Sequence, residues 1–215
     1  MGIAGNSKSK NRQKEREILK NADELYQRGN TLIQQGDYSG ALEAFEQTVK
    51  IKPEYVEAYF CQGVALYSLG RFEEALHAYG RATELKPDYA DAWYNRAIVL
   101  CDLQKFEESL PTYQQVVQLR PDFANGWAGI GYSLYWLGRF TDALQPLSKA
   151  SELEPDNPEY LYVRACVYAR LGDRANALQD IAKTVKLNAG YKPRIKNYDD
   201  FRSLWEDEDF KRLVK

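Results

Sequence analysis

The sequence predicts an all-α protein, an α-solenoid of five helix-turn-helix repeats followed by short capping helices. Three observations predict this class. Prolines recur every 34 residues, at Pro53, Pro87, Pro121 and Pro155. Small residues and large apolar residues recur at the same interval. Each interval holds two apolar stripes at helical spacing, because side chains three and four positions apart share one face of a helix.

The first element in the chain is a basic segment. Residues 1–20 carry six Lys or Arg and two Glu, a net charge of +4. Residues 1–10 are mainly small, polar or basic and are expected to be disordered, whereas the charged run from about Asn11 is expected to extend the first helix. The segment has no apolar run typical of a secretory signal. We expect a flexible arm that keeps the chain in solution, or that touches an anionic membrane, nucleic acid or protein.

Five repeats of 34 residues then fill Ala22 to Tyr191 without an insertion or deletion. Their bounds are 22–55, 56–89, 90–123, 124–157 and 158–191. One small series is Gly29, Gly63, Ala97, Gly131 and Ala165, and one large apolar series is Phe45, Tyr79, Tyr113, Leu147 and Ile181. We expect the small residues where the two helices of a repeat meet, with the large ones filling the space beside them. One hairpin cannot bury both of its stripes, so neighbouring repeats must stack.

The second repeat illustrates how each helix ends. Its first stripe includes Tyr59 and Gly63. Gly70 follows in a predicted turn, where glycine can adopt a positive φ after a helix. The second helix is expected to end at Lys86, because Pro87 lacks an N–H group and disfavours helical geometry in the residue before it.

Residues 192–215 leave the period and predict two short helices that cap the last repeat. The first is expected to be capped by Asp199 or Asp200 and to carry Phe201, Leu204 and Trp205. The second is expected to begin at Asp207 or Asp209 and to carry Phe210, Leu213 and Val214. These apolar faces need a surface, and the exposed flank of the fifth repeat offers one. An alternative is that the tail is itself a binding element.

The repeat pattern resembles the tetratricopeptide repeat (TPR) family over about four-fifths of the chain. The tail is similar to the short endings of many bacterial TPR proteins, cyanobacterial ones among them. The resemblance implies a right-handed superhelix in which the first helix of each repeat lines a concave groove and the second faces outward. It also implies binding of peptides or protein segments in that groove, and it makes an enzyme improbable because family members are seldom enzymes.

Composition and motifs exclude several other classes of function. The net charge is −2 for the chain and −7 for residues 21–191, so general binding of nucleic acid is not expected. The sequence contains no apolar run of 18 residues, so no transmembrane helix is expected. The cysteines Cys61, Cys101 and Cys166 lack CxxC spacing and predict reduced thiols in the cytoplasm. His77 is the only histidine, and the sequence has no phosphate-loop, dinucleotide or hydrolase motif. We therefore expect no catalytic residue, metal site or cofactor.

The repeat register gives the candidate groove residues. They share the second, fifth, sixth, ninth, twelfth and thirteenth places of their repeats: Tyr26, Asn30, Glu57, Phe60, Tyr67, Asp91, Tyr94, Asn95, Gly129, Tyr132, Tyr135, Trp136 and Tyr162. The surface they predict is aromatic, with one acidic lip that adds Asp23 and Glu159 to Glu57 and Asp91. Aromatic rings with polar ends suit protein contacts. Tyrosine is common at the fifth and twelfth places of repeats in the family, so some of these aromatic residues are expected to be structural.

The fourth repeat departs most from the others. Gly126, Gly129 and Gly131 lie close together on one predicted helix, and the repeat pattern explains only Gly131. Each further glycine costs a helix about 0.5–1 kcal/mol relative to alanine. One hypothesis is that Gly129 is the floor of an anchor pocket for an apolar ligand side chain. Its walls would be Tyr94, Tyr132 and Tyr162. The alternative is a tolerated substitution with no function.

The predicted partner is another protein that presents a basic or apolar peptide or amphipathic helix. A C-terminal chaperone carboxylate is rejected, because one TPR subgroup uses lysine, asparagine and arginine for it and the matching places here lack the cations. Those places in the first three repeats hold Tyr26, Asn30, Cys61, Asp91 and Asn95. Self-association through the arm or the end repeats is the second hypothesis. Nucleic-acid binding through the arm is a third, against which the acidic repeats argue.

Overall fold

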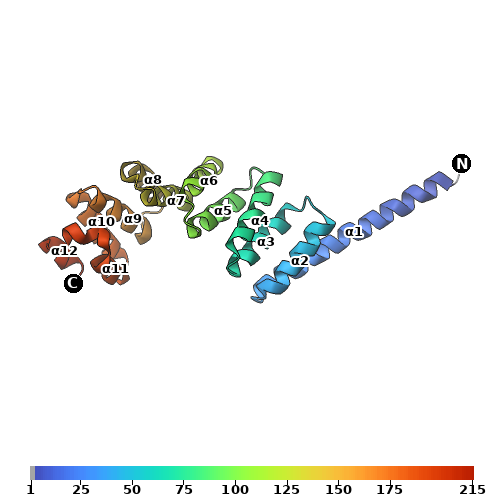
Figure 1. Ribbon diagram of the computed structural model, residues 1–215, viewed down its shortest axis with the longest axis horizontal. Helices are drawn as coiled ribbons and strands as arrows, with labels where there is room; N and C mark the ends of the chain where they lie inside the picture. Colours follow the sequence, from blue (N-terminus) through green and yellow to red (C-terminus); the bar gives the residue numbers. More distant parts are fainter. Residues whose placement is uncertain (1–2) are drawn as a thin grey trace. The chain divides into compact units, whose positions relative to one another are not determined.

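The computed structural model describes the backbone of residues 3–215 and the side chains from Leu19 onward. All regular structure in this part of the chain is helical, as predicted (Figure 1). The chain divides into an N-terminal unit, Met1–Leu103, and a C-terminal unit, Gln104–Lys215. Each is described by itself below.

Residues 3–103 of the N-terminal unit form five helices. They are α1 (Ile3–Gln34), α2 (Tyr38–Ile51), α3 (Val56–Ser68), α4 (Phe72–Leu85) and α5 (Ala90–Asp102). Helices α1 and α2 pack as one hairpin, α3 and α4 as the next, and α4 also packs against α5. Helix α1 begins at Ile3, whereas the sequence predicts disorder through residue 10. No proline lies between Ile3 and Gln34 to interrupt a helix. Residues 1 and 2 lie outside the described residues.

The C-terminal unit continues the alternation. It contains α6 (Phe106–Leu119), α7 (Ala124–Trp136), α8 (Phe140–Leu153), α9 (Pro158–Arg170) and α10 (Arg174–Leu187). Helix α7 packs on α6 and α8, and α9 packs on α8 and α10. Each repeat therefore supplies two consecutive helices, as the period predicts.

Tight packing of a small residue against a large one joins the helices of a repeat, as predicted. A Cβ atom added to Gly63 would lie 2.6 Å from the Tyr79 ring, and one added to Gly131 would lie 2.5 Å from Leu147. Gly29 has the same relation to Phe45. Such distances are below van der Waals contact, so only glycine allows these helices to approach so closely.

The turn within each hairpin also repeats. Gly36, Gly70, Gly138 and Gly172 have φ between +72° and +77°, and the third repeat has Gln104 at +57° in the same place. The prediction of a positive φ at Gly70 is therefore confirmed. Gln104 is the one departure, because this conformation is unfavourable for a residue with a Cβ atom.

After α10, four short elements cap the C-terminal unit. They are η1 (Ala189–Tyr191), α11 (Lys192–Asn197), η2 (Asp199–Leu204) and α12 (Glu208–Leu213). Their apolar side chains join one core with α9 and α10: Ile195, Phe201, Leu204, Phe210 and Val214 are all buried. The Asp207 carboxylate accepts hydrogen bonds from the first backbone N–H groups of α12, which is the cap predicted for this helix.

The predicted cap for the other short helix is wrong. The segment after Tyr198 is a 3₁₀ helix, and neither Asp199 nor Asp200 caps it. The Asp200 side chain is instead buried and accepts hydrogen bonds from Tyr135 of α7 and Arg170 of α9. Sequence alone does not show this role, because both partners are distant along the chain.

Candidate functional site

Four aromatic side chains gather where α6 and α7 meet in the C-terminal unit. We call Phe106, Tyr132, Tyr135 and Trp136 the α7 aromatic cluster. The Phe106 and Trp136 rings stack with centroids 5.7 Å apart and an interplanar angle of 9°. Tyr132 and Tyr135 meet the Trp136 ring edge-on at 6.0 and 5.4 Å. Such offset and edge-on pairs hold each ring in a defined position.

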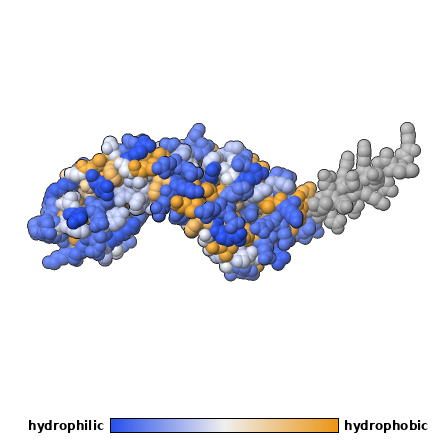
Figure 2. Space-filling model, in the orientation of Figure 1, coloured by the Kyte–Doolittle hydropathy of each residue, from blue (hydrophilic) through white to orange (hydrophobic). Residues whose placement is uncertain are grey.

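The cluster is unusual because much of it remains in contact with solvent. Trp136 is 48% exposed and Tyr132 is 38% exposed. The two residues are four positions apart on α7, so they lie on the same helical face. The face of the molecule drawn in Figure 2 is largely hydrophilic with separate hydrophobic patches. Large exposed aromatic rings held in place by neighbours are typical of protein contact surfaces.

A small cavity lies beside the cluster, between α7, α9 and the cap. It is lined by Tyr132, Tyr135, Trp136, Glu159, Tyr162, Val163, Cys166, Arg194 and Tyr198. The structure therefore brings together four of the predicted groove residues, from the fourth and fifth repeats. The cavity volume is about 60 Å³, which is room for about two water molecules and too little for a ligand side chain. A ligand at this place would have to lie on the exposed rings.

Tyr135 connects α7 to the cap. Its hydroxyl donates a hydrogen bond to Oδ2 of Asp200 and lies 3.2 Å from the Tyr198 hydroxyl. Arg170 donates to the other Asp200 oxygen at 3.2 Å. Burial of Tyr135 and its hydrogen bond to Asp200 both raise the pKa of Tyr135. Tyr135 therefore stays neutral and supports the cap, in addition to packing on Trp136.

Tyr162 is not available to a ligand, although the register places it in the groove. Its side chain is buried and its ring packs against Tyr191, Tyr198 and Phe201 of the cap. The Arg194 guanidinium lies 4.2 Å from the centre of the same ring. The prediction that Tyr162 faces a ligand in the groove is wrong, because the tail folds over the Tyr162 ring.

The hypothesis of an anchor pocket above Gly129 is also wrong. A Cβ atom on Gly129 would lie 2.4 Å from the Tyr113 ring of α6, and one on Gly126 would lie 2.9 Å from Val117. Both glycines therefore allow α7 to approach α6, and packing explains all three glycines of this helix. The anchor pocket predicted above Gly129 has no basis, because Tyr113 fills the space beside its backbone.

The predicted residues of the N-terminal unit form a second aromatic surface. The Tyr26 ring lies 5.0 Å from Tyr55, and the Phe60 ring lies 5.1 Å from Tyr89. Sequence reasoning missed Tyr55 and Tyr89. They occupy the last place of the first and second repeats, so the 34-residue period contained the signal. The half-buried Asn30 lies on α1, one helical turn after Tyr26.

Other predicted residues of this unit have partners of their own. The Tyr67 hydroxyl donates to Oδ2 of Asp102 at 2.8 Å, and this bond together with burial raises the pKa of Tyr67 to about 12. The Asn95 side chain donates to the backbone carbonyl of Asp91 at 2.8 Å, which leaves less of it for a ligand. Tyr94 is half-buried.

The acidic lip divides into two parts. Glu57 and Asp91 are exposed on the N-terminal unit. Glu159 of the C-terminal unit accepts a hydrogen bond from Tyr191 and forms an ion pair with Arg194 at 3.3 Å. The negative charge of Glu159 is therefore compensated by Arg194.

Three further findings concern metal ligands, the histidine and membrane-spanning helices. The side chains described from Leu19 onward contain no group of three metal-ligating residues. His77 is exposed on α4. No helix in the described part of the chain is long and apolar enough to span a membrane.

Comparisons with known proteins agree with the fold. Models described as tetratricopeptide or TPR repeats match residues 26–82, 63–102, 90–123, 131–172 and 158–191. A search of curated proteins finds no match.

Solved structures of TPR proteins resemble the chain over most of its length. MamA from Desulfovibrio magneticus RS-1 is 20% identical with a TM-score of 0.75, covering 79% of this chain and 96% of that one. YrrB, described as a TPR protein with an unusual peptide-binding site, is 21% identical with a TM-score of 0.73, covering 85% and 92%. At this identity the likeness concerns the fold alone. With the matching repeat models, the chain belongs to the tetratricopeptide repeat family, whose members are generally protein–protein interaction modules.

Proposed function

We propose that this chain is a non-enzymatic adaptor or assembly factor that binds a segment of another protein on the α7 aromatic cluster. The observation that carries the proposal is the exposure of Trp136 and Tyr132, at 48% and 38%, on rings held in place by Phe106 and Tyr135. Binding energy concentrates at rigid aromatic residues, because burying them gains much apolar contact for little lost conformational freedom.

The ligand is an apolar or basic segment, either extended or an amphipathic helix. Apolar side chains pack on the exposed faces of Trp136 and Tyr132, and lysine or arginine side chains interact favourably with the same faces. In the N-terminal unit, Glu57 and Asp91 lie close to the aromatic surface of Tyr26 and Phe60 and favour basic side chains. Peptide binding is also the property for which YrrB, a relative by fold, is described.

The same proposal places the protein in the cytoplasm or an equivalent reducing compartment. None of Cys61, Cys101 and Cys166 forms a disulfide with another described residue, and burial raises the pKa of the Cys166 thiol. Cysteines that remain thiols are expected in a reducing compartment.

The test is affinity capture of partners from a lysate of the source organism. The bait is the intact chain, compared with a Tyr132→Ala/Trp136→Ala variant. Tyr135 is left unchanged because its hydrogen bond to Asp200 supports the cap. The matched control is Leu171→Ala/Leu187→Ala, which removes two apolar side chains that are 42% and 41% exposed elsewhere on the C-terminal unit. Circular dichroism first establishes that all baits are equally helical.

The proposal expects a partner that the intact chain and the control retain and that the aromatic variant loses. Replacing two such aromatic residues is expected to weaken binding by a hundredfold or more, about 3 kcal/mol. A partner retained equally by all three baits would move the site away from α7.

Self-association is the second candidate, and one observation favours it. Helix α1 has 32 residues, whereas its hairpin partner α2 has 14. A second copy of the chain is one surface on which the longer helix can pack. Light scattering of the chain with and without residues 1–20 tests this function. Self-association requires a dimeric or larger mass that returns to the monomer when those residues are removed.

A further inference from the structure

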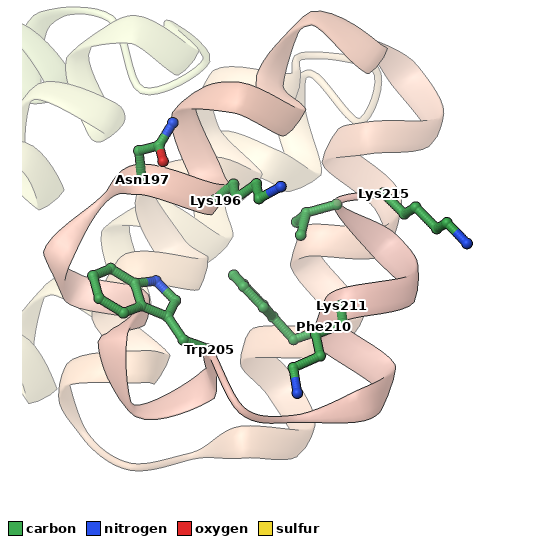
Figure 3. Close-up of a pocket in the computed structure, with 7 residues that line it drawn as sticks. Lys196, Asn197, Trp205, Phe210, Lys211 and Lys215 are labelled. Atoms are coloured by element: carbon green, nitrogen blue, oxygen red, sulfur yellow. The ribbon is translucent and has the colours of Figure 1, made fainter.

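A second cavity lies on the C-terminal cap and is not part of the α7 aromatic cluster. Its volume is about 540 Å³, within the range typical of ligand sites. The residues that line it are Lys196, Asn197, Trp205, Phe210, Lys211, Val214 and Lys215. They come from α11, from the turn after η2, and from α12 with the residues that follow it (Figure 3).

The cavity has an apolar floor. Phe210 and Val214 are 2% and 7% exposed, so they present only a small apolar surface to it. Trp205 lines the same cavity, and Figure 3 shows the Trp205 and Phe210 rings at its edge. An aromatic or aliphatic side chain of a ligand can pack against these three residues.

The rim of the cavity is positively charged. Lys196, Lys211 and Lys215 line it, and no carboxylate side chain does. Lys211 forms ion pairs with Glu206 and Glu208 at 3.1 and 3.2 Å. Lys196 and Lys215 make no ion pair with the described residues. Two ammonium groups are therefore available to a ligand that carries negative charge.

One hydrogen-bond donor also lacks an acceptor. The Trp205 indole Nε1 is buried and has no hydrogen-bond partner among the described side chains and backbone. Figure 3 shows this nitrogen on the ring edge nearest Lys196 and Asn197. A buried N–H group without an acceptor is unfavourable, and a carboxylate bound beside Lys196 would supply one.

We propose that this cavity is a second interaction site, which binds a short acidic peptide segment containing an aromatic or aliphatic side chain. The apolar side chain lies on Phe210, Trp205 and Val214, and a neighbouring carboxylate pairs with Lys196 or Lys215 and accepts from the Trp205 indole. The α7 aromatic cluster selects apolar or basic segments. The two sites therefore differ in charge preference and can hold two different partners.

A peptide fits better than an anionic membrane. The segment from Glu206 to Asp209 contains four consecutive carboxylates next to the cavity. An extended anionic surface would meet this whole segment and be repelled by it, whereas a short acidic peptide can approach from the side of Lys196 alone.

The test uses the full chain and a fluorescein-labelled peptide of sequence Glu-Asp-Phe-Asp-Leu-Glu. Fluorescence polarisation measures its affinity, and the indole resonances in a ¹H–¹⁵N spectrum report which tryptophan it reaches. The charge variant is Lys196→Glu/Lys215→Glu. Its matched control, Lys183→Glu/Lys186→Glu, makes the same charge change at exposed lysines of α10 that do not line the cavity. Trp205→Phe keeps an aromatic ring but removes the N–H donor, and it assigns the Trp205 resonance.

The proposal expects saturable binding that shifts the Trp205 indole resonance. Binding should weaken at least tenfold in the charge variant, several-fold in Trp205→Phe, and not in the control. A peptide with serine in place of Phe and Leu should bind weakly. Absence of saturable binding, or equal affinity in the charge variant, would overturn the proposal. Binding to phosphatidylserine vesicles without binding to the peptide would overturn it in favour of a membrane contact.

Discussion

Replacing Gly129 by alanine tests the packing of α6 against α7 at a single atom. The added Cβ would lie 2.4 to 2.6 Å from three ring atoms of Tyr113. That ring is only 5% exposed, so it has little free space into which to move. Overpacking of this kind costs about 1–3 kcal/mol. Alanine regains about 0.5–1 kcal/mol of helix stability relative to glycine. We therefore expect Gly129→Ala to lower the free energy of unfolding by about 1–2 kcal/mol.

Gly80→Ala is the matched control. Gly80 lies inside α4, and a Cβ added there would meet no atom within 4 Å. This variant should gain about 0.5–1 kcal/mol from helix propensity alone. Urea denaturation followed by far-ultraviolet circular dichroism measures both changes. If Gly129→Ala stabilised the protein as much as Gly80→Ala does, the close approach of α7 to Tyr113 would be refuted. The Gly129 pocket would then need to be reconsidered.

Three further substitutions test other parts of the structure. Gln104→Gly should stabilise the protein by about 0.5–1 kcal/mol in the same denaturation assay, because Gln104 has a φ of +57° and glycine tolerates that conformation. Arg164→Met should destabilise the protein by about 3–5 kcal/mol, because the buried Asp180 carboxylate, 3% exposed, would lose its 2.7 Å ion pair with Arg164. A loss of stability below about 1 kcal/mol would contradict this. Asp102→Asn should lower the pKa of Tyr67 from about 12 toward its ordinary value of about 10, measured by tyrosinate absorbance against Tyr67→Phe as the blank.

The period of the sequence was sufficient to predict the helices and most of their ends. The pairing of Gly63 with Tyr79, and the positive φ of Gly70, follow from local spacing and from the properties of glycine. The cap at Asp207 follows from local chemistry as well, because a carboxylate before a helix accepts its first N–H groups. These features depend on residues within one repeat or one turn.

Three of the errors involve side chains whose partners are distant in the sequence. Asp200 was expected to cap a helix, but it accepts from Tyr135, 65 residues earlier. Tyr162 was expected in the groove, but the tail covers it. One hypothesis placed a pocket above Gly129, but the neighbour of Gly129 is Tyr113 of the preceding repeat. A repeat register shows which helical face a residue occupies, but it does not show which neighbouring segment covers that face.

The most direct test of the proposed function is site-specific photo-crosslinking. A p-benzoylphenylalanine residue placed at position 136 puts a reactive group on the α7 aromatic cluster. The same residue at position 187 serves as the control, because Leu187 is 41% exposed where Trp136 is 48% exposed. After irradiation in lysate, mass spectrometry identifies the crosslinked peptide. Binding on the α7 aromatic cluster predicts a crosslink from position 136 to an apolar or basic segment of a partner protein, and none to that segment from position 187. Crosslinks to the same segment from both positions, or from position 187 alone, would contradict binding at the α7 aromatic cluster.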